Sequence, residues 1–135
     1  MIDIELMLDT NIMSHFMRFP AGHVAERIRR YNVQSTGISI IVASELRYGI
    51  ARVNSQRLQH QIEWALSFVT ILPLEPPVDE IYANLRDRLA KEGRPIGPND
   101  LFIAAHALAL NVPLVTDNIG EFSRVPDLRV ENWLD

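Results

Sequence analysis

The sequence predicts a three-layer α/β/α domain built on a mostly parallel sheet. Two observations support this fold class. Short apolar runs typical of strands alternate along the chain with stretches of helical period, and strands separated by helices pair in parallel. The chain has 135 residues, of which 47% are hydrophobic, and it shows no internal repeat or linker. We therefore expect one domain with one core, covering residues 1–135.

The apolar period predicts each element in turn. Residues 2–9 alternate apolar and polar side chains, which is typical of a strand with one apolar and one mixed face, and this strand ends at Asp9. Thr10 and Asn11 offer caps for a short helix before the turn at Pro20. The remaining expected elements are, in chain order, a helix over 22–31, a strand over 36–41, helices over 41–53 and 55–68, a strand over 69–72, helices over 78–91 and 99–110, a strand over 112–116 and an edge strand over 128–130.

Composition excludes several classes of protein. The chain has no cysteine, so a disulfide-stapled module and a thiolate metal site are ruled out, and its four histidines lack the spacing of a zinc site. No apolar run reaches the roughly 18 residues of a membrane span, and the first residues carry acids where a signal peptide carries bases. No glycine-rich phosphate loop or serine elbow is present. We expect a soluble, cytoplasmic protein.

Polar residues follow the expected strands where a parallel sheet binds its ligands, beyond the carboxyl ends of the strands. Asp9 ends the first strand in the run LMLDTN, and Thr116, Asp117 and Asn118 follow the run VPLV. Asp100 stands at the start of the most apolar helix, where Asn99 or Asp100 is expected at the cap position. Taken alone, Asp9 and Asp100 can each be explained as a helix cap, and polar residues such as Asp117 are common in loops.

Considered together, the acids indicate a functional site more strongly than each does alone. Glu45 lies within the apolar run IVASELRYGI, where a buried, unpaired carboxylate would be costly, so it must face solvent, pair with a base such as Arg47 or coordinate a cation. If Asp9, Glu45, Asp100 and either Asp117 or Glu121 converge, the carboxylates repel one another and raise one another's pKa. Magnesium or manganese relieves this repulsion, because hard cations prefer oxygen ligands. The reaction that most naturally uses such a site is phosphodiester hydrolysis.

Four segments carry a resemblance to a known family. The runs LMLDTNI, SELRYGI, GRPIGPNDLFIAAHAL and LVTDNIGEFSRVPDLRVENW, in this order and spacing, resemble the PIN-domain ribonucleases that serve as VapC-type toxins of toxin–antitoxin systems. The resemblance spans nearly the whole chain. It implies a PIN-like fold and a magnesium-dependent endoribonuclease whose catalytic acids match Asp9, Glu45 and Asp100.

The resemblance also implies partners. Such toxins are held inactive by a cognate, VapB-type antitoxin that wraps the toxin and reaches into the acidic pocket, and they are commonly homodimers. Their substrates are structured RNAs, often tRNA. The GRPIGPND run makes the anticodon loop of initiator tRNA the first candidate.

The fourth acidic position departs from the family pattern. By spacing from Asp100, Asn118 is the closest equivalent, and it is neutral, so Asp117 or Glu121 must supply any fourth charge. A single Mg²⁺ held by Asp9 and Asp100 is the simpler expectation. Manganese is a possible substitute. In this hypothesis Glu45 orients or deprotonates the attacking water, while a second set of polar groups, namely Thr10, Asn11 and Thr116, positions waters or phosphate oxygens.

The net charge of -4 looks unsuited to an RNA substrate. If four of the 17 acids line one pocket, however, the remaining acids equal the 13 bases in number. The arginines nearest in sequence to the motifs, Arg47, Arg86 and Arg94, are then candidates for RNA contacts. Apolar side chains of the early helices, including Ile12, Phe16 and Phe19, are candidates for an antitoxin groove, with core packing as the alternative.

Two alternatives stay open. The first is a non-catalytic PIN-like scaffold that binds RNA or a partner, to which the neutral Asn118 lends some support. The second is a phosphoacceptor receiver domain. A receiver needs a lysine after a late strand, whereas the only lysine, Lys91, precedes Asp100.

Overall fold

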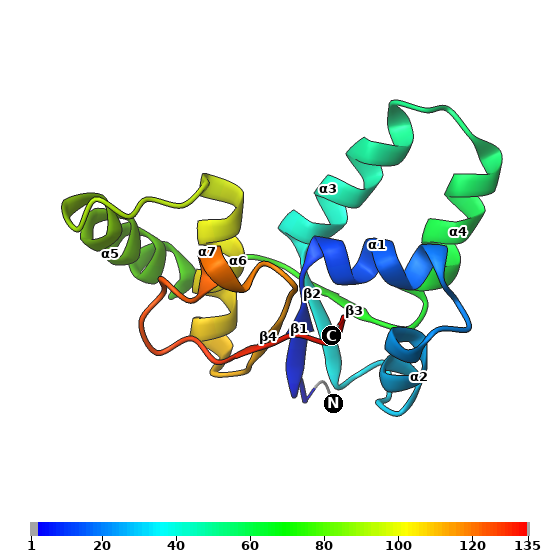
Figure 1. Ribbon diagram of the computed structural model, residues 1–135, viewed down its shortest axis with the longest axis horizontal. Helices are drawn as coiled ribbons and strands as arrows, with labels where there is room; N and C mark the ends of the chain where they lie inside the picture. Colours follow the sequence, from blue (N-terminus) through cyan, green and yellow to red (C-terminus); the bar gives the residue numbers. More distant parts are fainter. Residues whose placement is uncertain (1–2, 135) are drawn as a thin grey trace.

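The computed structural model describes residues 3–134, and in this range the chain forms five strands and seven helices (Figure 1). Their bounds are β1 Leu6–Leu8, α1 Thr10–Arg18, α2 His23–Arg29, β2 Thr36–Ser39, α3 Ile40–Ala51, α4 Gln56–Leu66, β3 Thr70–Leu72, α5 Val78–Lys91, α6 Pro98–Leu110, β4 Leu114–Val115, α7 Ile119–Phe122 and β5 Val130–Glu131. No helix in this described range is long and apolar enough to cross a membrane.

The strands form one sheet in the order β3-β2-β1-β4-β5, and every neighbouring pair is parallel. Helices α1 to α4 lie on one side of the strands and α5 to α7 on the other, with α3 and α4 projecting beyond the sheet as a hairpin (Figure 1). The predicted three-layer α/β/α fold is confirmed.

The strand order creates a switch point in the middle of the sheet. From β1 the chain moves outward through β2 to β3, then returns to add β4 and β5 on the other side of β1. Leu8 pairs with Val115, and the Asp9 amide donates to the Val115 carbonyl at 2.9 Å. The residues that follow β1 and β4 therefore lie side by side, at the edge where open parallel sheets bind ligands.

The first two strands differ from their predicted form. Ile2 lies outside the described residues, and the strand begins at Leu6. Its two faces are both buried, because β1 is a central strand with helices on both sides, and the predicted mixed face is wrong. The second strand ends at Ser39 rather than at Ile41, since the Ser39 hydroxyl accepts a hydrogen bond from the Ile41 amide and caps α3.

The helix that carries Asp100 begins earlier than predicted. Gly97 is the N-cap and Pro98 the first helical residue, a position that proline favours because its missing N–H has no partner there. Neither Asn99 nor Asp100 is therefore the cap, and Asp100 lies in the first turn. The helix ends at Asn111 in the left-handed conformation (φ 56°), which asparagine tolerates.

Two residues predicted to line an antitoxin groove belong to the core. Ile12 and Phe16 are fully buried, and the Phe16 ring lies 4.9 Å from the Trp64 ring and 5.4 Å from the Phe68 ring. That part of the prediction is wrong: the apolar side of α1 packs against α4. Phe19, by contrast, is 51% exposed.

Phe16→Ala is expected to lower the free energy of unfolding by about 3–5 kcal/mol, because it removes a buried ring and leaves a cavity between α1 and α4. Urea denaturation followed by circular dichroism measures the loss. Phe19→Ala is the matched control, and its exposed ring predicts a loss below about 1 kcal/mol. Equal losses in the two variants would contradict the described packing of α1.

Candidate active site

Asp9 is held at the end of β1 by both of its carboxylate oxygens. It is the N-cap of α1, with Oδ1 accepting from the Thr10 amide at 2.7 Å, and Oδ2 accepts from the Thr116 hydroxyl at 2.7 Å. The side chain is only 5% exposed. Each carboxylate oxygen has two lone pairs, so both can still accept a further ligand. The cap of α1 is therefore Asp9, and not Thr10 or Asn11 as predicted. Asp9 also remains available to a ligand.

The charged form of Asp9 is disfavoured in the free protein. Burial raises the pKa of this carboxyl, and the nearby charges of Glu45 and Asp117 raise it further. The hydrogen bonds from Thr116 and Thr10 act against this rise. A cation beside Asp9 would remove the remaining penalty.

Among the carboxyl groups of the site, Asp100 has the most strongly shifted pKa. Burial raises the pKa of its carboxyl to about 7, with further contributions from a hydrogen bond to Glu121, from the Glu121 charge, and from the charges of Asp9 and Glu45. The four carboxyl groups therefore share one electrostatic environment. Near neutral pH, a proton on Asp100 lets it donate to Glu121 instead of repelling it.

The segment after β4 brings Glu121 to Asp100. Glu121 Oε1 accepts from the Gly97 amide at 3.2 Å, and Oε2 accepts from the Asn118 side-chain amide at 2.7 Å. Asn118 is held in turn by a hydrogen bond from its backbone amide to the Thr116 hydroxyl at 3.0 Å. Asn118 thus positions a carboxylate rather than replacing one.

Helix α7, which includes Glu121, was not among the predicted elements. It has only four residues, too few for a helical period to be visible in the sequence. Asp117, the other candidate for the fourth acid, is exposed and accepts from the Asn11 side chain at 3.0 Å. Glu121 is therefore the acid that contacts Asp100, and Asp117 lies on the rim near Asp9.

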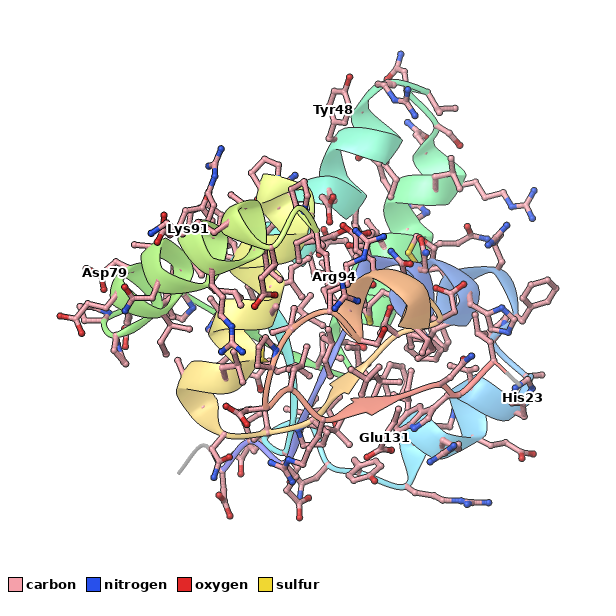
Figure 2. The ribbon with its side chains drawn as sticks, turned by 60° about the vertical axis from the view of Figure 1, so that its left-hand side comes forward. His23, Tyr48, Asp79, Lys91, Arg94 and Glu131 are labelled. Carbon is pink, nitrogen blue, oxygen red and sulfur yellow. The ribbon has the colours of Figure 1, made fainter. Side chains whose placement is uncertain are left out.

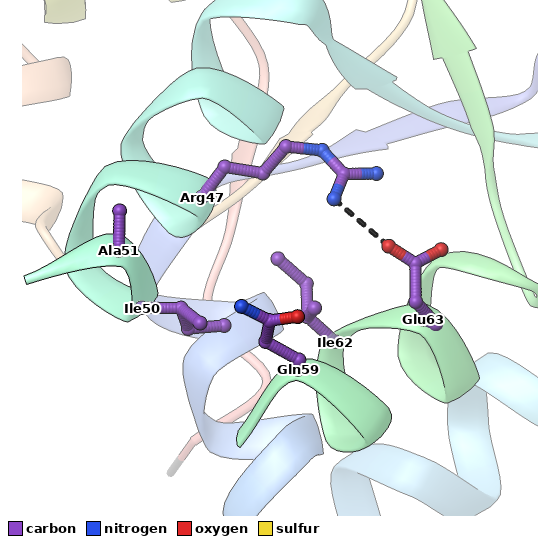
Figure 3. Close-up of a pocket in the computed structure, with 6 residues that line it drawn as sticks. All are labelled: Arg47, Ile50, Ala51, Gln59, Ile62 and Glu63. Carbon is purple, nitrogen blue, oxygen red and sulfur yellow. Dashed lines mark hydrogen bonds and ion pairs between the residues drawn. The ribbon is translucent and has the colours of Figure 1, made fainter. Parts of the chain in front are cut away.

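Glu45 is joined to the site by Thr10. The Thr10 hydroxyl donates to Glu45 Oε1 at 2.5 Å, so α1 and α3 are linked beside Asp9. Arg47 does not pair with Glu45, since residues two apart on a helix face different sides. It forms an ion pair with Glu63 of α4 at 2.8 Å, across a small cavity of about 220 Å³ (Figure 3).

The other two predicted RNA-contacting arginines are exposed. Arg86 donates to the Tyr82 hydroxyl at 2.7 Å, and Arg94 lies in the loop between α5 and α6 (Figure 2). This loop is held against the α7 segment, since the Arg124 side chain donates to the Pro95 carbonyl at 3.0 Å. RNA contacts by all three arginines stay a prediction, since the Arg47–Glu63 ion pair is exposed and weak.

The chemistry of the donor set fits a hard cation. Mg²⁺ is usually held by one or two carboxylates and keeps several waters. Within residues 3–134 no three His, Cys, Asp or Glu side chains form a ready-made metal cage. The charge of Asp9 raises the pKa of Asp100, and these two carboxyl groups are the pair that a divalent cation would stabilise.

A groove runs beside the acids between α1, α3 and α4. It has a volume of about 410 Å³. Its polar end includes Thr10 and Glu45, and its apolar lining is formed by Met17, Leu46, Ile50 and Leu58. The apolar residues beside the acids are thus a different set from the Ile12, Phe16 and Phe19 that the sequence suggested.

The lysine needed by a receiver domain is absent from this edge of the sheet. Lys91 lies at the end of α5, where it pairs with Asp87 of the same helix at 2.7 Å (Figure 2). This pairing on an exposed surface leaves the receiver alternative without its essential cation.

Comparisons with known proteins agree with this geometry. The PIN-domain family model matches residues 6–128. Ribonuclease VapC2 of Rickettsia felis is 37% identical over 129 residues, covering 94% of this chain and 96% of the relative, and the tRNA(fMet)-specific endonuclease VapC of Salmonella typhimurium is 32% identical over 131 residues, covering 96% and 98%. The crystal structure of Rickettsia felis VapBC2 bound to a DNA fragment from its promoter superposes with a TM-score of 0.86 at 34% identity, covering 96% of this chain and 99% of that chain. The chain therefore belongs to the PIN-domain family, among the VapC ribonucleases.

Proposed function

We propose that this protein is a magnesium-dependent endoribonuclease toxin that hydrolyses phosphodiester bonds in structured RNA, with manganese as a possible substitute metal. The observation that carries the proposal is the pair Asp9 and Asp100 at the switch point of the sheet, where the pKa of Asp100 rises to about 7 partly because of neighbouring carboxylates. Carboxylates forced together in this way are typical of a site whose charge is balanced by a cation.

The residues have distinct roles in this proposal. Asp9 and Asp100 hold the metal, which when bound neutralises charge on the phosphoryl group and makes a water more acidic. Glu45, held by the Thr10 hydroxyl, orients the attacking water and accepts its proton. Thr116 keeps Asp9 in place through its hydroxyl. Asn11, on the rim, is available to a phosphate oxygen or a water.

We assign the fourth acidic position to Glu121. Its contact with Asp100 and its two hydrogen bonds, from Gly97 and Asn118, support this choice over Asp117. Glu121 then orients Asp100 and would add negative charge to the site that holds the metal. One ion between Asp9 and Asp100 remains the simplest stoichiometry.

The proposed substrate is tRNA, and the anticodon loop of initiator tRNA is the first candidate. The name of the Salmonella typhimurium relative, a tRNA(fMet)-specific endonuclease, supports this choice. The same GRPIGPND run that led to this candidate forms the loop and first helical turn that carry Asp100.

A VapB-type antitoxin is the proposed inhibitor, acting on a homodimer of this chain. Several related structures are described as VapBC complexes. The groove between α1, α3 and α4 fits an antitoxin segment, because an apolar floor leads directly to Glu45 and Thr10. An inhibitor bound there would cover the residue that accepts the proton from water.

Mapping of RNA 5′ ends after a short induction of the protein tests the proposed activity. We expect one dominant new end in the anticodon loop of initiator tRNA, because a dedicated toxin makes a single cut in its target. Co-expression with the antitoxin provides the control and should remove that end. An unchanged set of 5′ ends after induction would refute the nuclease assignment, and a dominant cut in another RNA would refute the tRNA assignment alone.

A further inference from the structure

One exposed face of α1 lies beside the acids and, apart from Asn11, has no role in the proposed mechanism. Asn11, His15 and Arg18 follow one another at intervals of four and three residues, so they share one side of the helix. The buried residues of α1 occupy the opposite side. Phe19 follows directly as the C-cap residue and extends the same face.

Four residues form a small cluster on this face, which we call the α1 patch: His15, Arg18, Phe19 and His23. The His15 ring lies 4.7 Å from the Phe19 ring, at an interplanar angle of 42°, and 6.0 Å from the His23 ring. The Arg18 guanidinium carbon lies 6.0 Å from the Phe19 ring centre. His23, labelled in Figure 2, is fixed by a 2.8 Å hydrogen bond from its Nε2 to the Trp133 carbonyl.

The patch contains an exposed aromatic ring and a guanidinium group that do not contribute to the core of the fold. All five phenylalanines lie in the described range, and Phe19 alone is exposed, with 51% of its surface accessible. Arg18 has no ion pair with any carboxylate of residues 3–134. An exposed ring beside an unpaired guanidinium can offer one flat apolar face and one positive charge to a ligand.

The patch is continuous with the acids. Asn11 donates to Asp117 at 3.0 Å, and the Asp117 charge acts on both Asp9 and His15. At the rise of an α-helix, His15 lies about 9 Å along the axis from Asp9 and Phe19 about 15 Å. A chain of RNA that places a phosphate on the acids therefore has neighbouring nucleotides within reach of the patch.

We propose that the α1 patch binds an unpaired nucleotide next to the scissile phosphate, with its base stacked on Phe19 and His15 and a phosphate paired with Arg18. This inference rests on the proposed RNA cleavage. Proteins recognise single-stranded RNA by stacking splayed bases on aromatic and histidine side chains, and guanidinium groups match phosphates. Partial burial, followed by the charges of His23 and Arg18, lowers the pKa of His15, so its ring is neutral at pH 7 and suited to stacking.

An RNA nucleotide fits the patch better than a protein segment does. A bound peptide needs an extended apolar surface, and the apolar side chains of that kind, Met17, Leu46 and Ile50, line the neighbouring groove, to which the patch contributes only Arg18. The α1 patch has a single large apolar ring surrounded by nitrogen-bearing groups. This combination matches one base and one phosphate.

A double-mutant cycle between protein and RNA tests the inference. The Phe19→Ala protein and the protein with Phe19 are each tested with intact RNA and with RNA in which single unpaired nucleotides near the mapped cut are made abasic. Binding is measured by fluorescence anisotropy. Both proteins also carry Asp9→Asn, so that the RNA stays intact. We expect about 10-fold weaker binding when either the ring or the matching base is removed, and no further loss when both are absent. In the cleaving protein, KM rises with little change in kcat.

Two further variants serve as controls. Phe19→Tyr keeps the ring and should restore binding, which also separates stacking from any misfolding of the alanine variant. Leu110→Ala removes an exposed apolar side chain at the far end of α6 and should leave RNA binding unchanged.

Three results would decide against the inference or its basis. Equal binding of intact and abasic RNA by the wild-type protein and by Phe19→Ala would overturn the stacking site, even if cleavage is confirmed. Weaker antitoxin binding by Phe19→Ala with unchanged RNA binding would show that the patch contacts protein instead. Absence of any RNA cleavage would contradict the proposed function itself, and this is read from the mapping of 5′ ends rather than from the binding cycle.

Discussion

Asp9→Asn is expected to lower RNA cleavage by at least about 1,000-fold. The substitution removes one of the two carboxylates proposed to hold the metal, and a metal ion supplies several kcal/mol of charge stabilisation, each 1.4 kcal/mol of which is worth about tenfold in rate. Cleavage of purified tRNA with magnesium measures the loss in vitro. Relief of growth arrest on expression measures it in cells.

The fold should survive this change. Asparagine is a good helix cap, and its side-chain oxygen can accept the hydrogen bond from the Thr10 amide as Asp9 does. Its amide can donate to the Thr116 hydroxyl, which now donates to Asp9. We expect an unchanged circular dichroism spectrum and intact antitoxin binding. Asp3→Asn, at an exposed acid near the start of the chain, is the charge-matched control and should cleave normally. Full activity of Asp9→Asn would exclude it as a metal-holding residue.

Asp100→Asn is expected to abolish cleavage and, above pH 7, to stabilise the metal-free protein. The folded-state pKa of Asp100, about 7, is higher than the roughly 4 expected in an unfolded chain, so the folded state binds the proton more tightly. The stability that this proton provides is fully present below about pH 4 and is lost as pH rises through 7. The variant has no such loss, and we expect it to exceed the wild type by about 1–2 kcal/mol at pH 8, a value reduced for screening of this half-buried group.

Urea denaturation at pH 4, 6 and 8 measures this difference. The two proteins should converge near pH 4. Magnesium should stabilise the wild type at pH 8 but not the variant, because only the wild type keeps both ligands. Asp87→Asn is a control on the exposed side of α5 and should show no such gain. A variant less stable than the wild type at pH 8 would show that Asp100 is not repelled by its neighbours.

The same proton affects catalysis in the wild type. A proton on Asp100 competes with the cation, so cleavage at limiting magnesium should fall as pH drops below about 7, and higher magnesium should move this fall to lower pH. A profile independent of magnesium would assign the titration to another group.

Local patterns in the sequence predicted most of the elements. The strand and helix periods located all five strands and six of the seven helices of the described range, because burial of one face leaves a regular trace in residue type. Boundaries were less accurate where a cap decided them. Ser39 ends β2 through its side chain, and Gly97 begins α6 through backbone geometry, which residue type indicates only weakly.

The fourth acidic position shows why the sequence left the choice among Asn118, Asp117 and Glu121 open. Spacing along the chain pointed to Asn118, but α7 turns the chain so that Glu121 contacts Asp100 while Asn118 holds Glu121. A helix of four residues leaves no periodic trace. Similarly, the sequence does not separate groove from core for Ile12 and Phe16, because apolar residues on an amphipathic helix look alike whether they meet the core or a partner.

The sequence by itself determined the fold class, since this depends on local period. It also singled out Asp9, Glu45 and Asp100 as polar residues placed after or within apolar runs, and their catalytic roles stay a prediction. Tertiary structure alone decided which acids meet. The order β3-β2-β1-β4-β5 sets the ends of β1 and β4 side by side and so joins Asp9 to Thr116, which are 107 positions apart. Strand order depends on the packing of helices across the whole sheet, and no local stretch of residues encodes it.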